Sequence, residues 1–485
     1  MKSLGKNAFY NVLYKGLNVL FPLVTMAYVS RVLLPIGVGR VASAQNIVAY
    51  FVLIASLGLP VYGVKAIAGC RDDKEEASRV FSELFIINAI SSVLCSFIYI
   101  MMILSLDFFS SKIIISLVVG IQLFANIINI DWLYQGYEEY RYITLRSFFV
   151  KTISLIAVLA FVRNEADYVI YALITSLSLV ANFVFNIIKF RKFVTLHFKR
   201  LNIQKHLKPV LVLFASTIAI EIYVLGGTTI LSLLKGDEAV AYYSYSTKAI
   251  AVVRTFIVAI GAVFLPRLNY YYSLHQYDKF NSLASLGIRI ILNLCIPVAI
   301  ALFVLADNLV LILFGNQYLP VIPSMRILCV SLVTIALSNF TGYQILISLG
   351  KERVVLYSTI IGAVINVIIN IILVIPYGHV GASIAAVITE GVIAIYQYYY
   401  VLRYVPIKIS NSELKNIFIP ALVMSIPMIA ILCLINNLYI GTIAASILGG
   451  LLYCTTSLRL KSDFFFLVLN KIPINQSLRN KIMRL

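Results

Sequence analysis

The residues best suited to chemistry are two cations in an otherwise apolar stretch, YSYSTKAIAVVRTF, which covers 243–256. Lys248 and Arg254 lie in a predicted helix over 239–265, and Arg254 is ten residues from Phe264 near one end of that helix. At 1.5 Å per residue this is about 15 Å, close to the middle of a bilayer. A charge at that depth is unfavourable unless it is paired or faces water. We therefore predict that Lys248 and Arg254 bind negative charge on a substrate.

Other polar residues are predicted at membrane depth. Lys15 lies in the first apolar segment, and Asn11 and Asn18 have the i−4 and i+3 spacing that shares its helix face. The deep acids are Glu221, at a depth similar to that of Arg254, and Glu390. Three deep cations against two acids predict a cationic interior and an anionic substrate, with Glu221 and Glu390 as coupling or pairing groups.

A static ion pair is the alternative for these charges. Arg254 and Glu221 lie on consecutive predicted helices and could pair to fix the packing of those helices. Lys15 and Lys248 would then still need partners, and Glu390 can serve only one of them. Both interpretations are compatible with the sequence.

Catalytic and metal-binding patterns are absent from the sequence. The four His and six Cys are scattered without the spacing of metal ligands. There is no phosphate-binding GxxxxGK[ST] and no GxSxG. We therefore expect no enzyme activity and no cofactor, and transport driven by a gradient, the membrane potential or downstream consumption.

The elements that position these residues are predicted to be transmembrane helices. Hydrophobic residues make up 61% of the chain and charged residues 12%, against about 45–50% and about 25% in soluble domains. Uncharged runs near 20 residues each suffice to cross a bilayer as a helix. We predict an all-α integral membrane protein with about fourteen transmembrane helices, over 8–29, 41–62, 80–106, 113–134, 147–162, 168–190, 209–233, 239–265, 283–306, 320–349, 354–375, 380–402, 417–435 and 438–457.

The Lys and Arg residues are distributed unequally between the two predicted sides of the membrane. Twenty-eight of the 39 Lys and Arg residues fall in segments on the side of the two termini. The positive-inside rule therefore predicts cytoplasmic termini. The net charge of +19 is explained by topology, so a nucleic-acid partner is not needed. The opposite side holds six, which are Arg31, Arg40, Lys112, Arg163, Lys235 and Arg326.

Short matches six helices apart suggest an internal repeat. The turn QGYEEYRYI (135–143) resembles SLGKERVVL (348–356), and GLP at Pro60 resembles FLP at Pro266. Repeats of this kind are common in transporters. We expect the two turns to act as equivalent inner gates, through Asp131, Glu138, Arg141, Glu352 and Arg353.

The repeat predicts two six-helix lobes, 1–190 and 209–403, in the same membrane orientation. Between them is a basic cytoplasmic linker, 191–208, whose cations would rest on anionic headgroups or, alternatively, dock a partner. An extra helix pair follows over 404–457. The tail, 458–485, is predicted to be a cytoplasmic interfacial helix.

Three motifs carry a resemblance to a known family. They are the N-terminal KNAFYNVLYKGLNVLFPLVTMAYVSRVL, DWLYQGYEEYRYI (131–143) and GHVGASIAAVITE (378–390). Together with the helix plan, they resemble the polysaccharide transporter branch of the multidrug/oligosaccharidyl-lipid/polysaccharide exporter superfamily, the Wzx-type flippases. One departure is VLGGTTILSLL (224–234), where related proteins often bear an acid.

The resemblance implies export of undecaprenyl-pyrophosphate-linked oligosaccharide units across the bacterial cytoplasmic membrane, for capsule, O-antigen or a related surface polymer. It also implies alternating access of two lobes around a cationic cavity. The substrate ligands would be Arg254, Lys248 and Lys15. Membrane lipids are further partners, and a polysaccharide polymerase and chain-length machinery are candidate protein partners.

Two other functions fit parts of the sequence. A drug/cation antiporter of the same superfamily would share the two-lobe plan, but it should have more acids than cations in its cavity. A non-transporting scaffold of the polymer-assembly complex would tolerate neutralisation of every deep charge.

Overall fold

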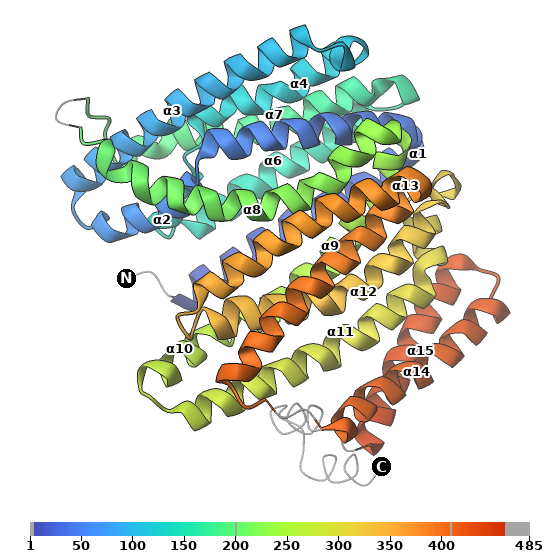
Figure 1. The fold of residues 1–485 in the computed structure, drawn as a ribbon. Helices are drawn as coiled ribbons and strands as arrows, with labels where there is room; N and C mark the ends of the chain where they lie inside the picture. The colour runs from blue at the N-terminus through green and yellow to red at the C-terminus, as the bar shows by residue number, and fades with distance from the viewer. Residues whose placement is uncertain (1–3, 199–200, 408–409, 461–485) are drawn as a thin grey trace. The chain divides into compact units, whose positions relative to one another are not determined.

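The computed structural model describes residues 4–198, 201–407 and 410–460. Within these ranges the chain forms helices and no strand (Figure 1). The α-helices are α1 (Leu4–Ser56), α2 (Leu59–Cys70), α3 (Lys74–Ser105), α4 (Ile113–Ala125), α5 (Asp131–Gly136), α6 (Tyr140–Phe161), α7 (Tyr168–Lys189), α8 (Gln204–Leu234), α9 (Gly236–Ala262), α10 (Leu265–Ser273), α11 (Tyr277–Leu313), α12 (Val321–Asn339), α13 (Glu352–Tyr404), α14 (Asn411–Leu434) and α15 (Leu438–Arg459). Short 3-10 helices are η1 (Asp107–Lys112), η2 (Asn126–Ile128), η3 (Glu165–Asp167), η4 (Phe190–Lys192) and η5 (Asn316–Tyr318), and η6 (Phe340–Leu346) is a π-helix.

The helices confirm the predicted all-α membrane fold. In the described ranges, 11 helices are long and apolar enough to cross a membrane, or 12 if the bent halves of α8 form one span. Two of these, α1 and α13, each have 53 residues and contain a break in helical geometry, at Leu34 and Gly378. The breaks fall between the predicted spans 8–29 and 41–62 in α1, and between 354–375 and 380–402 in α13, and the predicted total of fourteen stays a prediction. The predicted tail from residue 461 onward lies outside the described residues.

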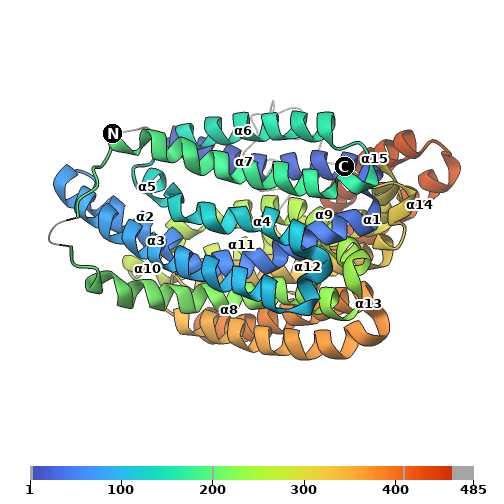
Figure 2. The same cartoon turned by 90° about the horizontal axis from the view of Figure 1, so that it is seen from above.

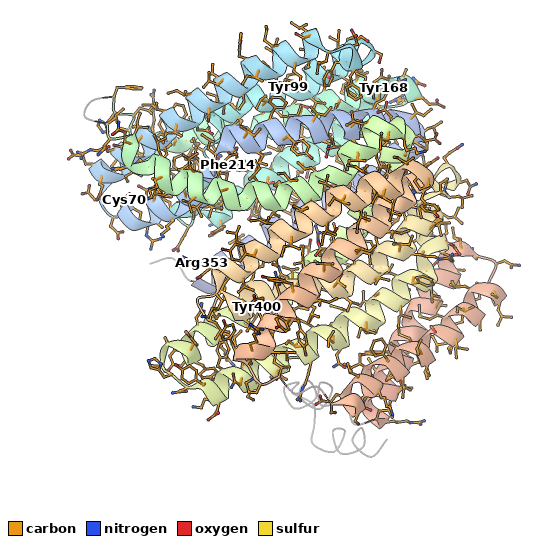
Figure 3. The ribbon with its side chains drawn as sticks, in the orientation of Figure 1. Cys70, Tyr99, Tyr168, Phe214, Arg353 and Tyr400 are labelled. Atoms are coloured by element: carbon orange, nitrogen blue, oxygen red, sulfur yellow. The ribbon has the colours of Figure 1, made fainter. Side chains whose placement is uncertain are left out.

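The two parts of α13 form a hairpin. Gly378 has φ 54° and ψ −131°, a left-handed region that a glycine adopts without a Cβ clash. The ammonium of Lys351, just before α13, lies 4.9 Å from the ring centre of Tyr404 at its end. Arg353 and Tyr400 accordingly lie at the same end of the hairpin in Figure 3. The reversal at Gly378 therefore separates two predicted spans.

The chain divides into two compact units, Met1–Ser244 and Tyr245–Leu485. Unit 1 holds α1 to α8 and the first turns of α9, with α6 and α7 side by side (Figure 2). In unit 2, α14 packs against α15, and both contact α11. The predicted lobe boundaries at 190 and 209 stay a prediction.

A break divides the predicted span 113–134. The α-helix ends at Ala125, and the backbone of residues 126–129 leaves α-helical geometry. The Asn88 side chain donates to the carbonyls of Asn126 (2.7 Å) and Ile127 (3.2 Å). At membrane depth such carbonyls need an internal donor. Hydropathy misses this break because the residues on both sides of it are apolar.

Prolines begin equivalent short helices in the two units. Pro60 occupies the first turn of α2, and Pro266 occupies the first turn of α10. Proline is tolerated there because the N–H that it lacks has no intrahelical partner. The GLP and FLP matches therefore mark the same structural feature, a short helix after a long one.

Aromatic residues form the core at one end of unit 1. The ring of Phe81 packs against those of Trp132 and Phe190, with centroid separations of 5.6 and 5.5 Å. Val194 in the linker and Val210 in α8 belong to the same buried cluster. The linker is thus part of the folded core of unit 1.

Candidate functional site

The cations of α9 lack ion-pair partners in the described part of the chain. Lys248 and Arg254 are both exposed. Glu221 on α8 is half-buried, likewise has no described ion pair, and acts electrostatically on the Tyr50 hydroxyl. Arg254 belongs to unit 2 and Glu221 to unit 1, so the static Arg254–Glu221 bridge stays an alternative prediction.

The predicted polar face of α1 is only partly described. Asn11 and Lys15 lie on α1, but their side chains are outside the described part of the structure. Asn18 is exposed and hydrogen-bonds with Tyr14.

Glu390 lies in a buried polar layer of the α13 hairpin and is itself buried. Next to it, Thr389 accepts a hydrogen bond from Asn366 on the other part of the hairpin, at 3.1 Å. The Asn370 amide donates to the Asn366 carbonyl at 2.9 Å. The bond from Asn366 to Thr389 joins the two parts of the hairpin, and the bond from Asn370 lies within the first part.

Asp131 belongs to a buried polar cluster. Its carboxylate lies 3.1 Å from Arg146 and accepts a hydrogen bond from Asn186. The Arg146 guanidinium also donates to Asn186, and both charges act on Tyr14 of α1. The structure therefore gives this predicted gate residue a role in joining α5, α6 and α7 beside the first helix.

The other predicted gate residues are near helix starts. Glu138 has φ 56° and forms an ion pair of 2.8 Å with Arg71, which raises the pKa of that guanidinium. Arg141, Glu352 and Arg353 are exposed. Figure 3 places Arg353 at the start of α13.

Sequence reasoning missed a polar contact among α1, η1 and α9. Asp237, in the first turn of α9, accepts hydrogen bonds from Lys112 (2.7 Å) and Ser43 (3.0 Å). Both charged side chains are largely buried. We call Ser43, Lys112 and Asp237 the outer latch, because charge distribution predicts that this end of the helices is outside.

Two further contacts lie near the outer latch, one between α1 and α8 and one between α1 and α9. On α8, Thr229 accepts from the Asn46 amide at 2.7 Å and lies 3.1 Å from the Tyr50 hydroxyl. A Cβ built on Gly39 would lie 1.7 Å from the Asp237 carbonyl oxygen, so only glycine permits this approach. The sequence signal was an acid just before a predicted span and one of the six cations predicted on the same side.

A second contact that the sequence analysis missed surrounds Glu83 on α3. Its carboxylate is fully buried and accepts from residues of the linker and of α8. The sequence suggested only a cap or gate position for it. No group of three or more His, Cys, Asp and Glu in the described ranges could hold a metal ion.

The fold defines a class, a multi-span α-helical membrane protein. The chain belongs to the polysaccharide biosynthesis protein family, whose sequence model matches residues 4–271. The model of the lipid II flippase MurJ family matches residues 138–449. The predicted family resemblance is therefore confirmed.

Two relatives are similar over most of their length. The putative O-antigen transporter of Shigella dysenteriae is 25% identical over 398 residues, covering 81% of this chain and 98% of that protein. The putative O-antigen transporter of Escherichia coli K12 is 23% identical over 409 residues, covering 80% of this chain and 94% of that protein.

Solved structures share the fold. The lipid II flippase MurJ in an inward closed conformation has a TM-score of 0.76 at 13% identity, covering 94% of this chain and 99% of that chain. A multidrug resistance MATE family transporter in an inward-facing conformation has a TM-score of 0.62 at 18% identity, and the match covers 79% of this chain and 94% of that chain.

Proposed function

We propose that this chain is a flippase that moves undecaprenyl-pyrophosphate-linked oligosaccharide units from the cytoplasmic to the outer leaflet. Similarity to the putative O-antigen transporters over nearly their whole length supports this function. The product would feed capsule, O-antigen or a related surface polysaccharide.

The observation that carries the substrate assignment is the pair of exposed cations on α9. In the described residues neither Lys248 nor Arg254 has an ion pair, although both lie within a predicted span. An ionised side chain facing lipid is strongly unfavourable, so an exposed cation at this depth favours a water-filled path. A guanidinium binds phosphate oxygens through two parallel hydrogen bonds, which suits a pyrophosphate.

The cellular setting belongs to the same proposal. The membrane would be the bacterial cytoplasmic membrane, and the positive-inside distribution supports cytoplasmic termini. Its partners are the lipid-linked oligosaccharide, membrane lipids, and a polysaccharide polymerase with its chain-length machinery. In this scheme Asn11, Lys15 and Asn18 line the path, and Glu221 and Glu390 are coupling or pairing groups.

The proposed gates lie at opposite ends of the helices. The outer latch would close the exit, and the turns 131–141 and 350–353 would act at the inner mouth. Cross-links between those two turns should change in yield when lipid-linked substrate is present. Equal yields with and without substrate would count against a gating role.

Gene deletion with complementation tests the function. Loss of surface polymer together with accumulation of lipid-linked units in the inner leaflet supports a flippase. Normal polymer after deletion contradicts it. A drug/cation antiporter would instead change drug sensitivity and leave the polymer intact.

A further inference from the structure

The linker docks along one face of α3 through backbone hydrogen bonds. The Thr195 N–H donates to the Ser78 hydroxyl at 3.0 Å, and the His197 N–H donates to the Ser82 hydroxyl at 2.8 Å. Ser78 and Ser82 are four residues apart, so they lie one turn apart on the same helix face. The linker therefore follows α3 for at least three residues.

The buried Glu83 carboxylate joins α3 to the rest of the linker. It accepts from the Asn202 backbone N–H at 2.6 Å and from the Lys205 ammonium at 3.0 Å. It also accepts from Nε2 of His206 at 2.7 Å, and Nδ1 of His206 lies 2.8 Å from the Tyr62 hydroxyl on α2. Three donors thus converge on a side chain with no exposed surface.

The first three turns of α8 pack closely against Gly58, just before α2. Gly58 has φ 76°, and a Cβ there would lie 2.8 Å from the Phe214 backbone nitrogen. Val194 and Val210, on either side of the contacts of Glu83, are fully buried. Undocking the linker would leave a buried carboxylate without donors and expose both valines, and each change is unfavourable.

We propose that Glu83 is a positioning residue that keeps the described linker residues 191–198 and 201–208, which include the first turn of α8, docked on α3 throughout the transport cycle. The segment between the predicted lobes then acts as a fixed strap, in contrast to a free tether resting on headgroups. This inference rests on the proposed function, because the cycle in question is that of the flippase.

A cross-link between α3 and the linker tests whether the strap must move. The Ser78 and Thr195 hydroxyls are 3.4 Å apart, so the double variant Ser78→Cys with Thr195→Cys should react efficiently with a short membrane-permeant bismaleimide in cells of the host strain. Radiolabelled sugar given after treatment measures newly made surface polymer. Each single cysteine variant, treated identically, controls for reactions with the native cysteines.

The proposal expects efficient cross-linking and polymer synthesis within about twofold of the single variants, since the bond joins parts that never separate. Two results overturn it: cross-linked cells that lose polymer synthesis while the single variants keep it, or no cross-link at all. Cross-linking is measured on the protein itself. A failure of the strap proposal can therefore be distinguished from a failure of the flippase proposal, which would appear as normal polymer in the deletion strain.

Glu83 is tested by its effect on the linker. In a Thr195→Cys background, Glu83→Ala should raise the rate of maleimide labelling at residue 195 by about tenfold or more, because the linker opens more often. Glu83→Gln retains one acceptor for the Asn202 N–H, so it should give an intermediate rate. Equal rates in all three proteins would contradict the positioning role, and protein abundance in the membrane controls for misfolding.

Discussion

At the scale of single residues, charges in this chain fall into paired and unpaired groups. Asp131, Glu138 and Asp237 all have cationic partners within 3.1 Å. Lys248 and Arg254 have none in the described part and are exposed. Paired charges join helices, whereas unpaired cations remain available to a ligand. This contrast supports our proposal that the two cations of α9 contact the substrate.

Arg254→Ala should abolish most export while the protein remains in the membrane. Loss of a charged hydrogen bond of about 1.5–3 kcal/mol corresponds to a decrease of roughly tenfold to a hundredfold in substrate affinity. Arg254→Lys keeps the charge without the planar fork and should retain part of the export. The amount of surface polymer measures export, and immunoblots of the membrane fraction measure the abundance of the protein in the membrane.

The control for this prediction is the double variant Arg254→Ala with Glu221→Gln. If the two residues formed a structural bridge, the single variant would lower abundance and the double variant would restore both abundance and export. Normal export by the double variant would remove Arg254 from the substrate path.

Asn88→Ala should destabilise the protein without changing the substrate path. It removes the donor from two carbonyls at the break after α4. A lost donor to a buried carbonyl is worth about 1–3 kcal/mol. A lower melting temperature of the purified protein in detergent would show the effect. Ser425→Ala, at a half-buried site on α14, removes only a donor to the Leu422 carbonyl of the same helix, so it is the matched control and should leave the melting temperature unchanged.

At the scale of elements, the spans were predictable and their contacts were not. Hydropathy placed a span at 209–233, and α8 covers Gln204–Leu234, because apolar length is a local property. Lys112 and Asp237 are 125 residues apart, so no periodicity links them. The donors to Glu83 come from a segment that appeared to be an open linker. Such contacts require knowledge of which helices are neighbours.

The outer latch should open for substrate release. In the double variant Ser43→Cys with Asp237→Cys, a disulfide would hold α1 against the start of α9, and export should stop under oxidising conditions. Reductant should restore it, since the 3.0 Å contact of the native side chains suits a short bond. Ser43→Cys alone is the control. Full export by the oxidised double variant would show that these elements need not separate.

At the scale of the whole molecule, topology decides which contacts can work as gates. The linker, 191–208, contains six Lys and Arg residues. The positive-inside rule therefore predicts that it lies in the cytoplasm. The outer latch would then lie on the opposite side, where cations are few. Both assignments depend on one orientation, so a single labelling experiment tests them together.

Lys192→Cys and Glu165→Cys form a matched pair for that experiment, since both positions are exposed and lie at opposite ends of α7. An impermeant maleimide added to intact cells should label residue 165 and leave residue 192 unlabelled until the membrane is opened. The reason is electrostatic, because basic segments are retained on the cytoplasmic side during insertion. Labelling of residue 192 from outside would show that the topology is the reverse of the predicted one. The latch would then be at the inner mouth, and Glu83 would anchor the linker on the outer side.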